Sequence, residues 1–339
     1  MSGRATAKTP RILSMRSTAR KGVTDPLRPN ATTARHFLSI LDLSPDELDR
    51  VLVLSSVMKR ERACGRTGDR SLAGKHVALL FEKPSLRTRS TFAIAVRELG
   101  GDVIEPPDHV ALGGRESIED VARNLERWVA AAVVRTFSQQ VLQRFAAAAT
   151  RMPVINALTD EEHPCQMIAD LLTLRERFGD LQGRTIAFVG DGNNVATSLA
   201  YASALVGLKL RLATPKGYEL PEQVIRTASD VARNGATITV TTDPVEAVRG
   251  AEAVYTDVWT SMGQEAQAVK RERVFRPYQV NAKLMAAAEP HALFMHCLPA
   301  HRGAEVTDEV MDSETSVVFE QAENRLHAQK ALLSLLVGR

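Results

Sequence analysis

The feature that most constrains the fold is an alternation of apolar, strand-like runs with helix-like segments, which occurs twice along the chain. The first series covers residues 75–179 and the second covers residues 184–338. Such alternation is typical of parallel sheets flanked by helices. The chain has 339 residues, enough for two domains that each bury a core. We therefore predict an α/β protein with two domains, each a parallel sheet flanked by helices.

The segments themselves follow from hydrophobic periodicity and from stop signals. Before the first series, a helix is expected to begin at Ser44 and Pro45. Strands are expected at 75–83, 131–137, 153–158, 184–192, 208–215, 236–242, 252–259 and 291–299. Helices are expected at 90–101, 139–149, 164–179, 196–207, 221–235, 243–250 and 322–338. In parallel sheets ligands bind at the carboxyl ends of the strands, so the chemistry is expected there.

Composition argues against several classes of protein. The net charge is only +3 and aromatic residues make up 5%, which disfavours nucleic-acid binding. No apolar run approaches the length of a membrane span. Cys64, Cys165 and Cys297 are widely spaced, so neither a zinc site nor a disulfide framework is predicted, and a reducing cytoplasm is expected.

Residues 1–35 differ from the rest of the chain, because they carry eight Lys or Arg residues against one acid, Asp25. We expect a disordered basic extension or a start placed too early. A transit peptide, which would place the protein in the mitochondrial matrix, is the alternative, since such peptides are rich in Arg and Ser and poor in acids.

The stretch FEKPSLRTRSTF, residues 81–92, follows the first apolar strand. Ser85 stands at the N-cap of the following helix, with Arg87 and Thr88 in its first turn. A helix N-terminus favours an anion, and arginine pairs with phosphate in a bidentate manner. A capped surface helix with solvated arginines explains the local pattern equally well.

Two further strand ends carry polar residues. Arg135 ends an apolar strand, where an ordinary surface charge is the alternative. His163 takes an N-cap position, followed by Pro164 and Gln166, and simple capping is the alternative there. The helix dipole is expected to disfavour protonation of His163, which leaves a neutral imidazole that can donate a hydrogen bond.

In the second series, FVGDGNNVATS matches only the start of a dinucleotide fingerprint, because Val195 replaces its third glycine. A ligand loop that carries asparagine is favoured. Asp257 and Cys297 also end strands. A thiol next to His296 suggests a nucleophile. Adjacent strand residues point to opposite faces, however, so we do not expect a Cys–His dyad.

Five stretches in this order, FEKPSLRTR, HPCQ, DVWTSMGQE, HCLP and AENR, resemble the signature motifs of ornithine carbamoyltransferases, within the aspartate/ornithine carbamoyltransferase superfamily. The resemblance runs from about residue 36 to the C-terminus and implies two domains linked by two interdomain helices. It implies a carbamoyl-phosphate-binding domain at 36–178, onto which a C-terminal helix at 321–339 packs back. An ornithine-binding domain is implied at 180–320.

The resemblance also implies residue roles. Carbamoyl phosphate would be bound by Ser85, Leu86, Arg87, Thr88, Arg135, His163, Gln166, Cys297, Leu298 and Arg325. L-Ornithine would be bound by Asn194, Asp257, Ser261 and Met262. Within the first set, the residues expected to take part in catalysis are Arg87, Thr88, Arg135, His163 and Cys297. Leu86 departs from the usual threonine, and Ala111 from a Gln or His that relatives offer to a neighbouring subunit.

The implied reaction is direct attack of the neutral δ-amine of L-ornithine on carbamoyl phosphate, giving L-citrulline and phosphate, in arginine biosynthesis. No metal or other cofactor is implied. The expected assembly is a homotrimer or a multiple of trimers. Alternatives are a carbamoyltransferase for putrescine or an N-acylornithine, a catabolic role in the arginine deiminase pathway, an inactive binding protein, and a nucleic-acid binder that uses the basic extension.

Overall fold

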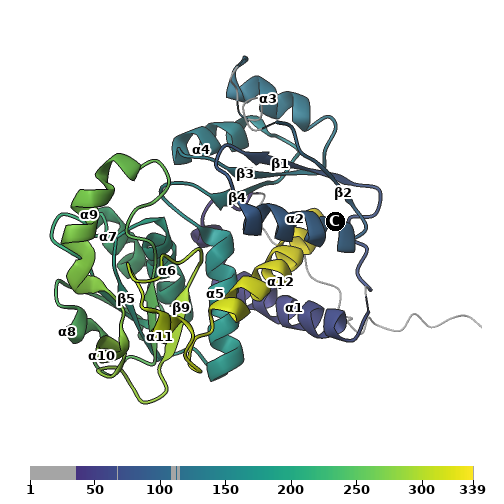
Figure 1. Ribbon diagram of the computed structural model, residues 1–339. Helices are drawn as coiled ribbons and strands as arrows, with labels where there is room; N and C mark the ends of the chain where they lie inside the picture. The colour runs from purple at the N-terminus through teal and green to yellow at the C-terminus, as the bar shows by residue number, and fades with distance from the viewer. Residues whose placement is uncertain (1–35, 67, 108–111, 113–114, 339) are drawn as a thin grey trace, which may run out of the picture. The chain divides into compact units, whose positions relative to one another are not determined.

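Two parallel sheets organise the chain (Figure 1). The structure, a computed structural model, describes residues 36–338 except 67, 108–111 and 113–114. The first sheet has the strand order β2-β1-β3-β4 and the second β7-β6-β5-β8-β9, and every adjacent pair is parallel. The predicted fold class is confirmed. The expectations for residues 1–35 and for Ala111 lie outside the described residues.

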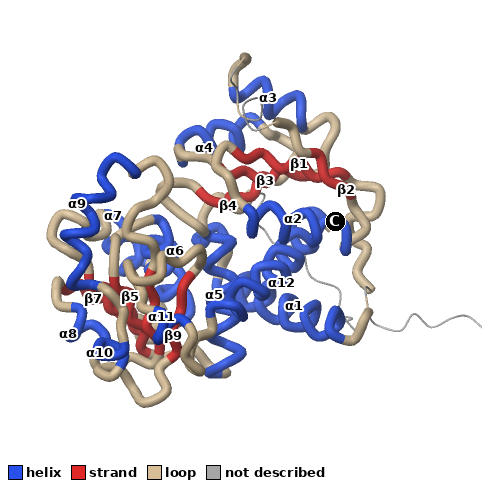
Figure 2. The backbone as a smooth tube through the Cα atoms, in the orientation of Figure 1, coloured by secondary structure: helices blue, strands red, loops and turns tan. Residues whose placement is uncertain are grey.

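The first sheet and its helices come from the N-terminal half of the described chain (Figure 2). Its strands are β1 (His76–Phe81), β2 (Asp102–Ile104), β3 (Ala131–Arg135) and β4 (Val154–Leu158). The helical elements are η1 (Ile40–Asp42), α1 (Pro45–Ala63), α2 (Leu86–Glu98), α3 (Ile118–Leu125), α4 (Gln139–Ala148) and α5 (Pro164–Phe178). Strand β3 is buried along its whole length, because helices cover both faces of a parallel sheet.

The second sheet follows the same plan. Its strands are β5 (Thr185–Val189), β6 (Lys209–Ala213), β7 (Thr237–Thr241), β8 (Ala253–Thr256) and β9 (Leu293–His296). The helical elements are α6 (Asn194–Val206), α7 (Glu222–Asp230), α8 (Pro244–Val248), η2 (Glu265–Gln267), α9 (Ala268–Phe275), η3 (Arg276–Tyr278), α10 (Ala282–Met285) and α11 (Asp308–Met311). Every predicted strand and helix is present; the strands are shorter than predicted, whereas α2, α6 and α12 (Val318–Val337) begin two to four residues earlier.

Helices α5 and α12 (Val318–Val337) link the two halves. Helix α12 packs against α1, α2 and α5 and also contacts β9, while α5 contacts both β4 and α6 (Figure 1). Every residue from 324 to 337 is buried, and the last turns, at 331–337, are apolar around the helix apart from Ser334. Among the described residues, no helix is both long and apolar enough to span a bilayer.

Helix starts place the polar groups that the sequence highlighted. Ser44 forms a capping box with Glu47 at the start of α1. Ser85 caps α2, since its Oγ accepts from the backbone N–H of Thr88 at 3.2 Å. His163 occupies the N-cap position of α5, yet its side chain makes no capping hydrogen bond. The imidazole is therefore free for another role.

Candidate active site

One cavity of about 1160 Å³ gathers strand ends and loops from both sheets. Parallel pairing aligns Phe81 with Arg135 on the first sheet and Thr256 with His296 on the second, so the residues that follow emerge at one edge of each sheet. The predicted site residues that line the cavity are Ser85, Leu86, Arg87, Thr88, Arg135, His163, Asn194, Asp257, Ser261, Met262, Cys297, Leu298 and Arg325.

Gln166 is the predicted site residue that lies outside the cavity wall. Its side chain is 0% exposed. Its Oε1 accepts a hydrogen bond from Nη1 of Arg325, and Nη2 of Arg325 donates to Thr88 Oγ1 at 2.5 Å. Gln166 thus reaches the cavity through the guanidinium of Arg325.

Three arginines form the positive side of the cavity. Arg135 is 6% exposed and Arg325 is 3% exposed. The Nε atoms of Arg87, Arg135 and Arg325 are all buried without a hydrogen-bond partner. Within the described part of the chain, none of the three forms a salt bridge. Because a buried, unpaired cation is costly, this cluster requires an anionic ligand.

Burial, and then nearby Arg325, lower the pKa of Arg135 to about 10, so Arg135 stays protonated at neutral pH. His163 is affected in the same direction. Burial first, and then Arg325 and Arg135, hold the pKa of His163 well below its usual range. The imidazole is neutral, as expected, but burial and the neighbouring cations outweigh the helix dipole as the cause. Its Nδ1 is buried without a partner.

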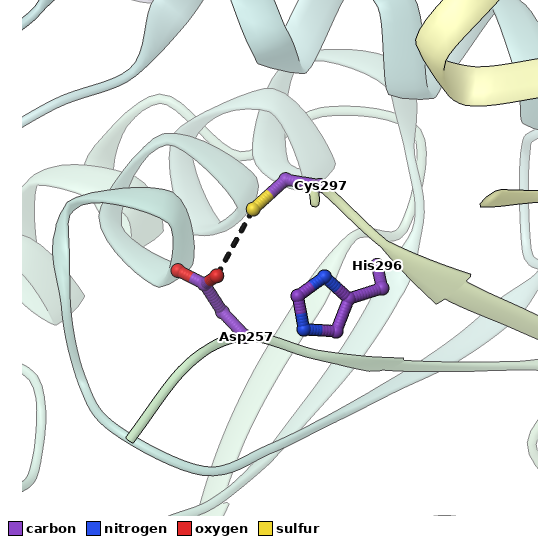
Figure 3. A group of neighbouring side chains, drawn as sticks. All are labelled: Asp257, His296 and Cys297. Atoms are coloured by element: carbon purple, nitrogen blue, oxygen red, sulfur yellow. Dashed lines mark hydrogen bonds between the residues drawn. The ribbon is translucent and has the colours of Figure 1, made fainter. Parts of the chain in front are cut away.

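The opposite side of the cavity carries a carboxylate. Asp257 accepts from Asn193 Nδ2 at 2.7 Å and from Cys297 Sγ at 3.0 Å (Figure 3). Burial, and then Asp257, raise the pKa of the Cys297 thiol well above its usual range. Cys297 is therefore a protonated hydrogen-bond donor, which disfavours the nucleophile interpretation.

Asp257, His296 and Cys297 also offer ligand atoms that lie within 4.8 Å of one another (Figure 3). Their hydrogen bonds do not suit a metal. His296 Nδ1 accepts from the backbone N–H of Leu298 at 2.9 Å, so its lone pair is engaged. A thiolate is the form of cysteine that binds metals, and the raised pKa of Cys297 opposes it.

The remaining predicted residues belong to the second half, Asn194 at the start of α6 and Ser261 and Met262 in the loop after Asp257. Asn194 donates from Nδ2 to the Thr159 carbonyl at 2.6 Å. The backbone N–H of Ser261 donates to Gln264 Oε1 at 3.2 Å. Met262 is 44% exposed at the rim. The donors of Asn194 and Ser261 would therefore have to exchange protein partners for a ligand.

Several residues that shape the site were not predicted. Asn193 holds Asp257 and also caps α6. Arg271 contacts the Asp191 carboxylate and the Trp259 carbonyl, and its guanidinium lies over the ring of Tyr218 at 4.8 Å. These contacts anchor the loop that follows Asp257. The N-cap position of Asn193 was readable from the sequence, whereas nothing local marked Arg271.

Gly192 explains the partial dinucleotide fingerprint. A Cβ at this position would lie 2.5 Å from the backbone nitrogen of Leu220. Its own N–H donates to the Tyr218 carbonyl at 2.9 Å. The glycine thus permits a close approach of two loops.

The fold and the cavity define a two-domain α/β enzyme in which buried arginines at one sheet edge face a carboxylate at the other. Residues 35–176 match the family model "Aspartate/ornithine carbamoyltransferase, carbamoyl-P binding domain", and residues 182–336 match "Aspartate/ornithine carbamoyltransferase, Asp/Orn binding domain". The chain belongs to the aspartate/ornithine carbamoyltransferase family and is a carbamoyltransferase.

Individual relatives agree with this assignment. The chain is 52% identical over 307 residues to an ornithine carbamoyltransferase of Parafrankia sp. (strain EAN1pec), a match that covers 90% of this chain and 96% of the relative. A solved ornithine carbamoyltransferase from Pyrococcus furiosus superposes with a TM-score of 0.87 at 46% identity, covering 90% and 97% of the two chains. A mitochondrial enzyme from Coccidioides immitis gives a TM-score of 0.84 at 36% identity, covering 90% and 98%.

Proposed function

We propose that this chain is an ornithine carbamoyltransferase, which transfers the carbamoyl group of carbamoyl phosphate to the δ-amine of L-ornithine. The observation that supports this most is the cluster of Arg87, Arg135 and Arg325, whose Nε atoms are buried without a hydrogen-bond partner, in one cavity with Asp257. An anionic substrate fits the cluster, and a cationic amino group fits the carboxylate.

The phosphate would lie against the N-terminus of α2. Ser85, Arg87, Thr88 and the Leu86 backbone N–H would hold it there, with Arg135 and Arg325 completing the charge. The exposed Leu86 side chain, 79% accessible, contributes no polar group. Gln166 and the backbone at Cys297 and Leu298 would hold the carbamoyl amide.

Catalysis would come mainly from fixed donors. Attack by the amine builds negative charge on the carbonyl oxygen and expels a phosphate dianion. Arg135, neutral His163 and Thr88 would stabilise the oxygen, while Arg87 and Arg325 would stabilise the leaving phosphate. Preorganised donors of this kind are usually the largest catalytic contribution. Holding both substrates in line supplies much of the rest.

L-Ornithine would bind on the second half. Asp257 and Ser261 would take its α-amino group, and Asn194 with the Met262 backbone would take its carboxylate. Cys297 would lie near the attacking amine as a polar, positioning group. Putrescine has no α-amino acid end for these residues, and an N-acylornithine has no charge on its α-nitrogen to pair with Asp257.

The attacking amine must be neutral, and such amines have a pKa of about 10.4 in water. We therefore expect kcat/KM for ornithine to rise with pH from neutrality to about 9, because the neutral fraction of the substrate grows. The measurement is the initial rate of citrulline formation across that range. A flat profile would contradict direct attack by the neutral amine as the pH-sensitive step.

The decisive test of the function is a carbamoylation assay with L-ornithine, N-acetylornithine and putrescine in parallel, each with carbamoyl phosphate. We expect turnover with ornithine. Turnover confined to putrescine or to the acylated amine would overturn the proposal. No carbamoylated product with any of the three would favour an inactive binding protein.

We further propose that a domain of residues 36–178, together with 321–339, binds carbamoyl phosphate, and that a domain of residues 180–320 binds ornithine. The proposed assembly is a homotrimer, or a multiple of trimers. The proposed pathway is arginine biosynthesis. A solution mass of three chains of 37.0 kDa, or a multiple of it, is expected. A cytoplasmic location and the lack of metal and nucleic-acid partners stay predictions.

A further inference from the structure

A buried carboxylate behind the cavity joins both halves of the proposed carbamoyl site. Asp170 on α5 is 0% exposed and does not line the cavity. Its Oδ1 accepts from Gln166 Nε2 at 2.8 Å and from Gln321 Nε2 at 2.9 Å. Its Oδ2 accepts from the Tyr255 hydroxyl at 2.7 Å. None of the roles assigned above uses Asp170.

The surroundings of Gln166 permit one direction of its side-chain amide. On one side lies Arg325, whose guanidinium can only donate, and on the other lies Asp170, whose ionised carboxylate can only accept. Gln166 must therefore turn Oε1 toward Arg325 and Nε2 toward Asp170. Burial raises the pKa of Asp170 and hydrogen bonds from Gln321 and Gln166 partly offset this, which leaves a pKa of about 6 and a carboxylate that is mainly ionised at neutral pH.

The side-chain amide of Gln321 on α12 is likewise oriented by its two hydrogen-bond partners. Its Oε1 accepts from the backbone N–H of His296 at 2.9 Å, and its Nε2 donates to Asp170. His296 ends β9, and its Nδ1 accepts from the backbone N–H of Leu298. The direction of this second amide thus sets the backbone that leads into Cys297 and Leu298.

We propose that Asp170 is a positioning residue for the carbamoyl group, because it fixes the direction of two amides that hold the two sides of that subsite. Gln166 holds Arg325, and Gln321 holds the backbone of residues 296–298. This inference rests on the proposed function, in which Gln166 and the backbone at Cys297 and Leu298 hold the carbamoyl amide. Asp170 thereby keeps the carbonyl oxygen of Gln166 toward Arg325 and that of Gln321 toward the backbone N–H of His296.

Asp170 could act through its negative charge or through the direction of the two amides. The two roles predict opposite effects of its removal on substrate binding, so they can be separated. Loss of a negative charge near Arg325 would, by itself, strengthen the binding of any anion. Loss of amide direction at Gln321 would weaken the binding of the carbamoyl group and leave the phosphate group unaffected, because Gln321 bonds to the His296 backbone and to Asp170 rather than to an arginine. Stability alone also explains a buried carboxylate poorly, because an apolar residue at such a position often gives a fold that is equally stable.

The test is Asp170→Asn in the full-length chain, which keeps the shape but places an NH₂ group against donors. We measure KM for carbamoyl phosphate at saturating ornithine, and the inhibition constant of inorganic phosphate, which lacks the carbamoyl group. We expect KM to rise about tenfold or more, as for lost hydrogen bonds to charged groups, with the phosphate constant unchanged or lower.

Tyr255→Phe is the matched control, because it removes one hydrogen bond from Asp170 and leaves both amides in place. We expect its KM for carbamoyl phosphate to stay within about twofold of the wild type. Gln321→Met is the second variant and decides the matter if Asp170→Asn does not fold. It removes both hydrogen bonds of Gln321, with the His296 backbone and with Asp170, while Gln166 keeps its partners, and it should also raise KM without weakening phosphate inhibition.

If KM for carbamoyl phosphate and the inhibition constant of phosphate stay unchanged or rise by the same factor in both variants, the role of Asp170 is overturned. The proposed function then still stands. A wild-type chain that forms no citrulline refutes the proposed function itself, and the inference with it. The wild-type assay therefore separates the two failures.

Discussion

At the scale of single residues, the site is built from charged groups whose partners come from a ligand. Arg87 is the clearest example, because it lines the cavity at the start of α2 with a buried Nε that lacks a hydrogen-bond partner. Arg89, two residues further along, pairs instead with Glu105 at 3.0 Å and lies over the ring of Phe81. The two arginines of one motif therefore have different tasks.

Arg87→Ala should raise KM for carbamoyl phosphate by about tenfold to a hundredfold, since a hydrogen bond to a charged group contributes about 1.5–3 kcal/mol. KM for ornithine should change far less. Steady-state kinetics with each substrate varied in turn measure both values. Arg89→Ala is the matched control and should leave both nearly unchanged. Equal losses for the two substrates in Arg87→Ala would contradict the assigned role.

Cys297 is expected to act as a hydrogen-bond donor to Asp257 and not as a nucleophile. Cys297→Ser keeps a donor at that position and should retain activity within about tenfold of the wild type. Because the pKa of the thiol is raised, Cys297 should also react slowly with iodoacetamide near neutral pH. The alkylation is best followed in a Cys64→Ser background, since Cys64 is exposed. Abolished activity together with rapid alkylation would restore the nucleophile interpretation.

All the site residues predicted from the sequence except Gln166 line the cavity, but the sequence did not show what stands behind it. Motif residues at strand ends could be placed because parallel strands end at one edge. Gln166 and Asp170, like Gln321 and Arg325, are spaced four residues apart, a spacing that puts both members of a pair on one helix face. That spacing was the available signal for Asp170. Its contacts with residues 85 and 151 positions away could not be read from local sequence.

At the scale of elements, burial decided which segments were predictable. Strands β1 and β3 are almost wholly buried and gave unbroken apolar runs. Strand β2 has three residues and is largely exposed at the sheet edge, and α10 and α11 have four residues each, so none carries a periodic pattern. Helix α3 and α9, of eight residues each, were also missed. These elements lie between the predicted ones and do not change the topology.

Helix α2 combines a structural cap with a ligand contact in Ser85. Ser85→Ala should cost about 1 kcal/mol of stability through the lost cap and should also raise KM for carbamoyl phosphate. Ser138 is the matched control, because it caps α4, accepting from Val141 at 3.3 Å, and lies outside the cavity lining. Ser138→Ala should lower the unfolding midpoint similarly with no effect on KM. Identical kinetics in the two variants would assign Ser85 to capping alone.

At the scale of the whole molecule, the two halves meet through buried polar groups as well as through α5 and α12. Glu162 accepts from the backbone N–H of Ile40 at 3.3 Å and from Ser198 Oγ at 3.1 Å. Ser198 Oγ accepts in turn from the backbone N–H of His163 at 3.0 Å. A carboxyl of the first half thus holds α6 of the second half next to a predicted catalytic residue. Burial raises the pKa of Glu162 from its usual 4.5 to about 7.

This raised pKa makes the stability of the molecule depend on pH in a definite direction. Below about pH 4.5, Glu162 is protonated in both the folded and the unfolded chain, so folding buries no charge at this position and the carboxyl costs no stability there. As the pH rises toward about 7, the unfolded chain releases the proton more readily than the folded chain does, so the free energy of unfolding falls. The full shift corresponds to about 3 kcal/mol.

Glu162→Gln keeps an oxygen acceptor but cannot ionise, so it should gain stability relative to the wild type as the pH rises from about 5 to about 8. Urea unfolding of both proteins at each pH measures the difference. Glu161→Gln is the control, because the neighbouring Glu161 is exposed, and its difference from the wild type should not vary with pH. A Glu162→Gln difference that is the same at both pH values would mean that the carboxyl is already charged in the folded molecule at the lower pH.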